Sequence, residues 1–162
     1  MKVRGILGLA ILILIVTAAA VVPAPTAHAD NRRLNESVFV NIYTAQKQNG
    51  CPTELQLDGR LVEAARRHTL DVLTHPEIDG DLGSDGSTTQ DRANAAGFTG
   101  KASETIAINP AIAISGIEIL SQFWYHPPYQ AIMRDCANTA IGVWSENSLA
   151  RSVVVAVYGQ PA

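Results

Sequence analysis

The chain has 162 residues, of which 47% are hydrophobic and 17% are charged, a length that suits one domain with a sizeable core. Twelve basic residues against 15 acidic ones give a net charge of −3. Beyond the N-terminal segment no basic stretch is present. This argues against nucleic acid as a partner and against electrostatic attraction to anionic membranes.

The N-terminal segment has the three parts of a secretory signal peptide. A positive start at residues 1–4 precedes an uncharged, mostly apolar run over 5–22, and small residues occupy an A-x-A position at 27–29. We predict that residues 1–29 are removed and that residues 30–162 form the domain. Loss of two basic residues then leaves 10 against 15 acidic ones, a net charge of −5. The alternative is an uncleaved anchor, since the 18-residue run is barely long enough to span a bilayer.

The two cysteines, Cys51 and Cys136, both lie in the predicted domain. In an oxidising compartment an isolated pair is most simply one disulfide. The disulfide would close a loop of more than 80 residues, worth on the order of 4 kcal/mol in the chain-entropy model. The alternative is two free or metal-binding thiols, which neither a C-x-x-C spacing nor a nearby His cluster supports.

Hydrophobic spacing predicts two helices in the first half of the domain. The first spans about 35–49, where apolar residues recur at every fourth position and Gly50 follows as a stop. The second follows Asp58 as its cap and runs to about Thr74. His68 falls on the apolar face of this helix, and a lone histidine there is more often a hydrogen-bonded core residue than a ligand.

Two further helices are predicted from their end signals. A capping box at residues 87–90 and Gly97 frame a short third helix. A fourth helix starts at 109–110, an Asn-Pro pair, and ends near Tyr125, because the prolines at 127–128 cannot continue it. Its apolar residues cover much of its circumference, which predicts burial in the core or, alternatively, an apolar groove for a lipophilic ligand. They are Ile112, Ile114, Ile117, Ile119, Leu120, Phe123 and Trp124.

The strand signals lie in the second half. Residues 140–144 and 152–158 are rich in β-branched and aromatic residues and flank a polar loop, which predicts an antiparallel hairpin. Residues 104–108 are a candidate third strand. Helices first, then strands among helices, predict an α+β domain in which an antiparallel sheet is covered by helices.

Five short segments follow one another in an order that is characteristic of one protein family. They contain Leu-Asp-Gly-Arg-Leu at 57–61, Gly-Ser-Asp-Gly-Ser at 83–87, Glu-Thr-Ile-Ala at 104–107, Phe-Trp-Tyr at 123–125 and Ile-Gly-Val at 141–143. In this order they resemble the bacterial members of the CAP superfamily, which also contains cysteine-rich secretory, antigen-5 and plant pathogenesis-related proteins. The C-terminal half is most similar to secreted, mycobacterium-type members. The resemblance implies a three-layer α/β/α sandwich with a cleft.

In many CAP proteins two histidines and two acidic residues face that cleft and can hold a divalent metal. At the matching positions this chain has Asp81 for the first histidine, Glu104 for the first acid, Pro127 for the second acid and Gln130 for the second histidine. A tight zinc site needs three or four nitrogen, sulfur or carboxylate ligands. We therefore expect no bound metal and no other cofactor.

The remaining cleft residues each allow two interpretations. Glu104 either contacts a ligand or accepts a hydrogen bond that holds the neighbouring loop. Asp81 either contributes to the cleft or is simply solvated in its glycine-rich loop. His126 either replaces the lost histidine or is a helix C-terminal residue favoured by the helix dipole.

Three functional hypotheses follow. The first, which we prefer, is a secreted binding module, extracellular or in the cell envelope, for a lipid-like molecule or an envelope component. The second is an extracellular, protease-like hydrolase that uses Glu104, Asp81 and His126 as acid or base groups. The third is a structural envelope protein without a small ligand. The first two rest in part on activities reported or proposed for the superfamily.

Overall fold

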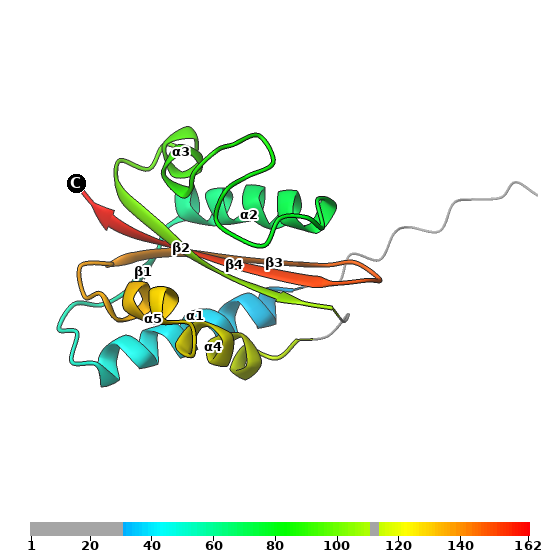
Figure 1. Ribbon diagram of the computed structural model, residues 1–162. Helices are drawn as coiled ribbons and strands as arrows, with labels where there is room; N and C mark the ends of the chain where they lie inside the picture. Colours follow the sequence, from blue (N-terminus) through cyan, green and yellow to red (C-terminus); the bar gives the residue numbers. More distant parts are fainter. Residues whose placement is uncertain (1–30, 111–113) are drawn as a thin grey trace, which may run out of the picture.

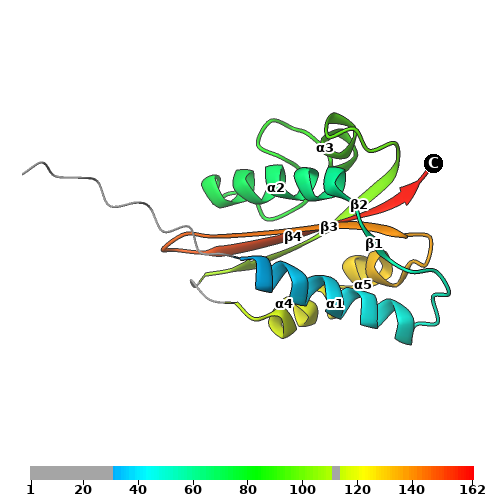
Figure 2. The same cartoon turned by 180° about the vertical axis from the view of Figure 1, so that it is seen from behind.

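A four-stranded sheet lies between two layers of helices (Figure 1). The computed structural model describes residues 31–110 and 114–162, so the predicted signal peptide lies outside the described residues. None of the helices in the described ranges is long and apolar enough to cross a membrane. The predicted α+β sandwich of three layers is confirmed. One face of the sheet carries α2 (Gly59–Thr74) and α3 (Thr89–Ala95), and the other carries α1 (Arg32–Gln48), α4 (Gly116–Trp124) and α5 (Pro127–Arg134) (Figures 1 and 2).

The strands occur across the sheet in the order β1-β3-β4-β2. They are β1 (Gln56–Leu57), β2 (Gly100–Asn109), β3 (Ala140–Asn147) and β4 (Ser152–Pro161). β4 pairs with β3 and with β2 in antiparallel fashion, which confirms the predicted hairpin and the third strand. However, β1 pairs with β3 in parallel, so the sheet is mixed and the prediction of an antiparallel sheet was wrong on this point. β1 has two residues, both exposed, and so carries no hydrophobic pattern that could have announced it.

β4 is the central strand, and its apolar run feeds both cores. Because successive side chains point to opposite faces, Val153, Val155 and Val157 pack with α2, whereas Val154, Ala156 and Tyr158 pack with α1 and α4. All six are fully buried. At roughly 1.5–3 kcal/mol for each large side chain, this strand binds the two helical layers to one sheet.

A glycine in β3 brings α2 close to the sheet. A Cβ atom at Gly142 would lie 2.0 Å from the backbone nitrogen of Val62, near the start of α2. Any side chain at this position would push the helix outward. The close approach sets the height at which α2 presents His68 to the sheet.

Helix starts follow local capping, with two shifts from the predictions. Asp58 caps α2 as expected, and its carboxylate accepts a hydrogen bond from the Arg60 backbone. α1 begins at Arg32, three residues before the predicted start. The capping box of α3 is formed by Thr88 and Asp91 rather than by residues 87–90, because both reciprocal bonds are made one residue further along.

The fourth predicted helix begins later in the structure, and an unpredicted helix, α5, follows its predicted end near Tyr125. Asn109 is the last residue of β2, where it pairs with Ser152, so it does not cap a helix. Instead, Ser115 caps α4 through a capping box with Glu118. The prolines that end α4 occupy the first turn of α5, where their missing N–H groups have no intrahelical partner to lose.

α4 is buried on one side only. Ile119 and Phe123 are fully buried, whereas Ile117 is 73% exposed, which corrects the expectation that apolar residues over much of the circumference bury the helix on several sides. Ile112, counted with this helix, lies outside the described residues.

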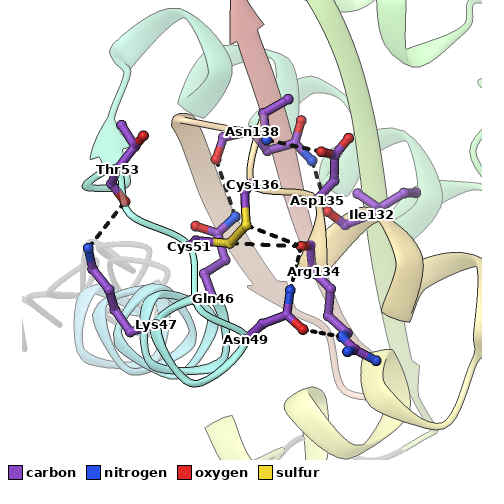
Figure 3. Close-up of a disulfide and its surroundings, with 11 residues drawn as sticks. Gln46, Lys47, Asn49, Cys51, Thr53, Ile132, Arg134, Asp135, Cys136 and Asn138 are labelled. Atoms are coloured by element: carbon purple, nitrogen blue, oxygen red, sulfur yellow. Dashed lines mark hydrogen bonds between the residues drawn. A yellow bond between two sulfur atoms is a disulfide. The ribbon is translucent and has the colours of Figure 1, made fainter.

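The predicted disulfide between Cys51 and Cys136 is confirmed (Figure 3). Its Cα atoms are 5.1 Å apart and its residues are separated by 85 positions. It joins the turn after α1 to the turn after α5. Beside it, the Asn49 side chain donates to the Arg134 carbonyl at 3.0 Å and accepts from Arg134 Nε at 2.7 Å. The same helical layer is therefore fixed by a covalent link and a reciprocal pair of hydrogen bonds.

Candidate binding cleft and the ion pair beneath it

Three elements bring polar side chains together between the sheet and the helical layer of α2 and α3. Glu104 comes from β2, Arg92 from α3 and His68 from α2. Arg92 Nη2 donates to Glu104 Oε1 at 2.8 Å, and His68 Nδ1 lies 2.8 Å from the same oxygen. The side chains of His68 and Glu104 are fully buried, and that of Arg92 is 7% exposed. A buried carboxylate needs such partners, because an unpaired charge away from water is very costly.

Arg92 also holds the loop that precedes α3. Its Nη2 donates to the Asp81 carbonyl at 2.7 Å, and its Nη1 donates to the Ser87 carbonyl at 2.7 Å. Through Arg92, Glu104 therefore anchors both ends of the loop 81–87. The middle of the loop is tied to α2, where Asp71 accepts hydrogen bonds from the backbone and hydroxyl of Ser84.

A few polar atoms of this cluster keep unused hydrogen-bonding capacity. Glu104 Oε2, His68 Nε2 and Arg92 Nε are buried and have no hydrogen-bond partner among the described residues. Such orphaned groups are uncommon in native proteins and cost about 1–3 kcal/mol each. Of these three residues, Glu104 is the one that lines the cleft.

The cleft lies at the edge of the sheet, beside β2, and has a volume of about 570 Å³. One wall is formed by the loop before α3 and by the first residues of that helix. The other wall belongs to α5 and its cap. The lining residues are Asp79, Gly80, Asp81, Thr88, Thr89, Gln90, Ala102, Ser103, Glu104, His126, Pro128, Tyr129 and Ile132.

Of the four positions matched to the family, Asp81 and Glu104 line this cleft, whereas Pro127 and Gln130 do not. His126, considered as a replacement for the lost histidine, also lines it. His126, Tyr129 and Ile132 recur at every third position, so they form one stripe along α5, and Gln130 falls beside it. Tyr129 was missed because α5 was not predicted, and without a helix the i, i+3 spacing had no meaning.

Negative charge dominates the cleft. The pKa of Tyr129 is raised first by burial and then by the negative charges of Glu104 and Asp81. Asp79 adds a smaller effect of the same sign. The Tyr129 ring lies against the ring of His126, with centroids 4.2 Å apart. Because Arg92 and Glu104 form an ion pair, their charges largely offset each other, and Asp79 and Asp81 supply the net negative charge of the cleft.

The residues present do not fit a divalent metal. Within the described ranges, no group of three or more His, Cys, Asp or Glu side chains is arranged to hold one. The carboxylate of Glu104 is in contact with a guanidinium instead, and a second cation at the same oxygen would meet its charge at close range. The chemistry of this cleft therefore has to come from the side chains of the protein.

Further hollows lie outside the cleft. One, of about 400 Å³, lies beside Asp71, Ser84 and Arg92. A second, of about 430 Å³, is largely apolar and lies beside α1 and β3, and a third, of about 320 Å³, lies between α1 and α4. The apolar groove that the sequence suggested beside the fourth helix therefore has a counterpart at α4, but the more apolar hollow is at β3. That hollow is lined by Arg32, Asn35, Glu36, Phe39, Val40, Leu57, Val62, Val143 and Trp144.

Among known proteins, no family model and no curated protein matches this chain. Among solved structures, an outer surface protein from Borrelia burgdorferi is similar with a TM-score of 0.72 at 14% identity, covering 83% of this chain and 98% of that one. An extracellular protein containing a SCP domain, from Bacillus anthracis, gives a TM-score of 0.67 at 14% identity over 79% of this chain and 40% of that one. The structure of NaASP2 with Zn2+ gives 0.57 at 8% identity, over 85% and 84%. The chain has a CAP-like fold.

Proposed function

We propose that this chain is a secreted CAP-like domain that binds a cell-envelope component in the cleft beside β2, without a metal and without turnover. The observation that carries the proposal is the use of Glu104. Its Oε1 is held by Arg92 and His68, so the one family carboxylate that remains supports the wall of the cleft. The cleft itself stays open at about 570 Å³.

Export is supported by three independent features. The N-terminal segment has the pattern of a signal peptide. Cys51 and Cys136 form a disulfide, which persists in oxidising compartments. Two structurally similar proteins carry the descriptions outer surface protein and extracellular protein. Together they favour a location outside the cytoplasm.

The hydrolase hypothesis has less support from the same geometry. A general base must come within hydrogen-bond reach of the proton that it removes. Glu104 is fully buried and already accepts from Arg92, whereas Asp81 is exposed on the loop. Turnover of a peptide substrate that is lost in both Asp81→Ala and Glu104→Ala variants would reinstate the hydrolase.

Binding can be tested by sedimentation with the insoluble envelope fraction of the producing organism. We expect saturable binding by the protein and a clear loss in an Asp81→Arg variant, because this change places a cation in the acidic cleft. Glu77→Arg is the matched control, since Glu77 is exposed, does not line the cleft and gives the same change in net charge when replaced. Absence of saturable binding to any envelope fraction would remove the proposal.

A lipid-like ligand is a second candidate, for which the apolar hollow beside β3 is the specific observation. Val40 and Leu57 line it and are 49% and 62% exposed, and an exposed apolar patch often marks a binding surface. Native mass spectrometry of the protein from its own culture medium would report a lipid-sized adduct, the signal cut and the two-dalton loss from the disulfide. An adduct that disappears in a Leu57→Glu variant would favour this candidate, whereas a bare chain would leave envelope binding or a structural role.

A further inference from the structure

The cleft runs along an open edge of the sheet. β2 is the last strand on its side, with β4 as its only strand neighbour among the described residues. The Ala162 N–H donates to the Thr99 carbonyl. Because hydrogen-bonded and non-hydrogen-bonded residue pairs alternate between antiparallel strands, this bond shows which residues of β2 direct their backbone groups toward β4. Odd-numbered residues of β2 therefore bond to β4, and the N–H and C=O groups of Gly100, Ala102 and Glu104 point outward.

Gln90 already pairs with part of that edge. Its Nε2 donates to the Gly100 carbonyl at 2.8 Å, and its Oε1 accepts from the Ala102 N–H at 2.9 Å. One side-chain amide thus takes the place that a backbone amide of a neighbouring strand would occupy. The next outward groups are the Ala102 carbonyl and the N–H of Glu104, to which no residue in 31–110 or 114–162 is hydrogen-bonded. Both residues line the cleft.

The walls beside this edge select for positive charge. Asp79 and Asp81 line the cleft from the loop side, and Glu104 Oε2 is a buried acceptor without a partner in the described part of the chain. None of the lining residues is a lysine or an arginine. An anionic ligand would be repelled, whereas an ammonium group would find the exposed carboxylates of Asp79 and Asp81.

We infer that the cleft takes an extended peptide segment that carries a primary amine, and that this segment pairs with the outer edge of β2 as an added strand. The inference rests on the proposed function and names its ligand class. Gln90 pairs with the Gly100 carbonyl and the Ala102 N–H, and Tyr129 interacts with the Ile106 backbone, so the open groups are those that lie between them. An extended backbone matches these groups, and strand addition is a recurrent mode of peptide recognition. The amine lies against the acidic wall, and Tyr129 and Ile132 on α5 contact the segment from the other side.

The test is an NMR titration of the 15N-labelled protein with the peptide acetyl-Ala-Lys-Ala-amide at low salt. We expect amide shifts centred on residues 102–106 and slower hydrogen exchange at the Glu104 N–H, with an affinity on the order of millimolar for so small a ligand. Two control peptides separate the contributions. Acetyl-Ala-Glu-Ala-amide reverses the charge and should not bind. A version with N-methylated backbone amides keeps the charge but cannot pair, and should bind at least about threefold more weakly.

Variants of the protein complete the test. Asp79→Asn with Asp81→Asn should weaken binding of the lysine peptide by about three- to tenfold, whereas Glu77→Gln should leave it unchanged. Equal binding of the N-methylated peptide, or shifts centred on α1 and β3, would overturn strand addition at this edge. If Asp81→Arg abolishes envelope binding while no peptide shifts residues 102–106, the proposed function stands and the peptide inference is wrong. If the peptide binds at β2 but no envelope fraction is bound, the reverse holds.

Discussion

Removing the charge of Glu104 should strongly destabilise the domain. In a Glu104→Gln variant the shape is kept, but the guanidinium of Arg92 loses its anionic partner at 2.8 Å. Both side chains are almost completely buried, at 0% and 7% exposure, so water cannot replace the lost interaction. Breaking a buried ion pair by removing one partner costs about 3–5 kcal/mol. We expect a loss at the lower end of this range, because the amide oxygen of glutamine can still accept one hydrogen bond.

A double-mutant cycle isolates the pair. Arg92→Met removes the same ion pair together with the bonds to the Asp81 and Ser87 carbonyls, so we expect it to cost about 4 kcal/mol. In the double variant neither charge of the pair is left buried without its partner. Its cost should therefore be less than the sum of the two single changes by about 2–3 kcal/mol.

Urea unfolding, followed by tryptophan fluorescence and by circular dichroism, measures these free energies. Trp124 lies in α4, and Trp144 packs against the core on the α2 side of the sheet, so coincident transitions also test two-state behaviour. Additivity of the single changes to within about 0.5 kcal/mol would refute the ion pair as the centre of the site. Hydrogen exchange in the loop 81–87 supplies a second readout, since loss of Arg92 should release that loop before the whole domain unfolds.

Three other expectations follow from the same structure. Reduction of the Cys51–Cys136 disulfide, which spans 85 positions, should lower the free energy of unfolding by about 4 kcal/mol, and an unchanged urea midpoint after complete reduction would contradict this. Burial raises the pKa of Tyr158 above its ordinary value of 10.0. As the pH rises, the unfolded chain therefore loses the phenolic proton before the folded chain does. The free energy of unfolding should be intact below pH 10 and fall as the pH rises from there through the folded pKa. A Tyr158→Phe variant should lack most of that alkaline loss, and a midpoint that falls as steeply as in the parent would show that other groups cause it. Finally, excess EDTA should leave the urea midpoint unchanged, and a lower midpoint would reveal a stabilising metal.

Much of the fold was predictable because its signals are local. The apolar face of α2, its Asp58 cap and the β-branched runs of the closing hairpin each lie within one short window, and the structure matches them. The disulfide was predictable for a different reason, since a lone pair of cysteines has only one possible intramolecular partner assignment. These elements need no knowledge of the tertiary structure.

The errors occurred where tertiary pairing outweighs a local signal. Asn109-Pro110 has the sequence of a helix start, but Asn109 continues β2 because β4 supplies a partner along its whole length. A Ser-x-x-Glu signature at Ser115 marks the true start of α4 and is visible in the sequence. β1 carries no such signature, since it exists only because β3 lies next to it.

The sequence predicted which residues lie near the cleft, but it did not predict which side chains they interact with. The family resemblance placed Asp81, Glu104 and His126 near one cleft, but nothing local to Glu104 says that its charge meets Arg92, twelve residues earlier. The pairing depends on how α3 sits on the sheet. His68 was expected to be a hydrogen-bonded core residue, and the structure adds that Arg92 Nη2 is its hydrogen-bond partner at 3.1 Å, with Glu104 Oε1 2.8 Å from the same Nδ1 atom.

Because an arginine lies beside Glu104, the shape of the cleft is maintained by a charge of the chain itself and not by a bound metal ion. A divalent cation stabilises a protein only in proportion to its concentration and affinity, whereas a guanidinium is part of the chain and stays charged at any physiological pH. The capping box of Thr88 and Asp91 fixes the start of α3, and Arg92 follows directly after Asp91, so the packing of α3 on the sheet brings its guanidinium to Glu104. The wall formed by residues 81–87 is thereby held whether or not a metal ion is present. A cleft built in this way suits recognition, because its shape is maintained by groups that a bound ligand does not have to displace.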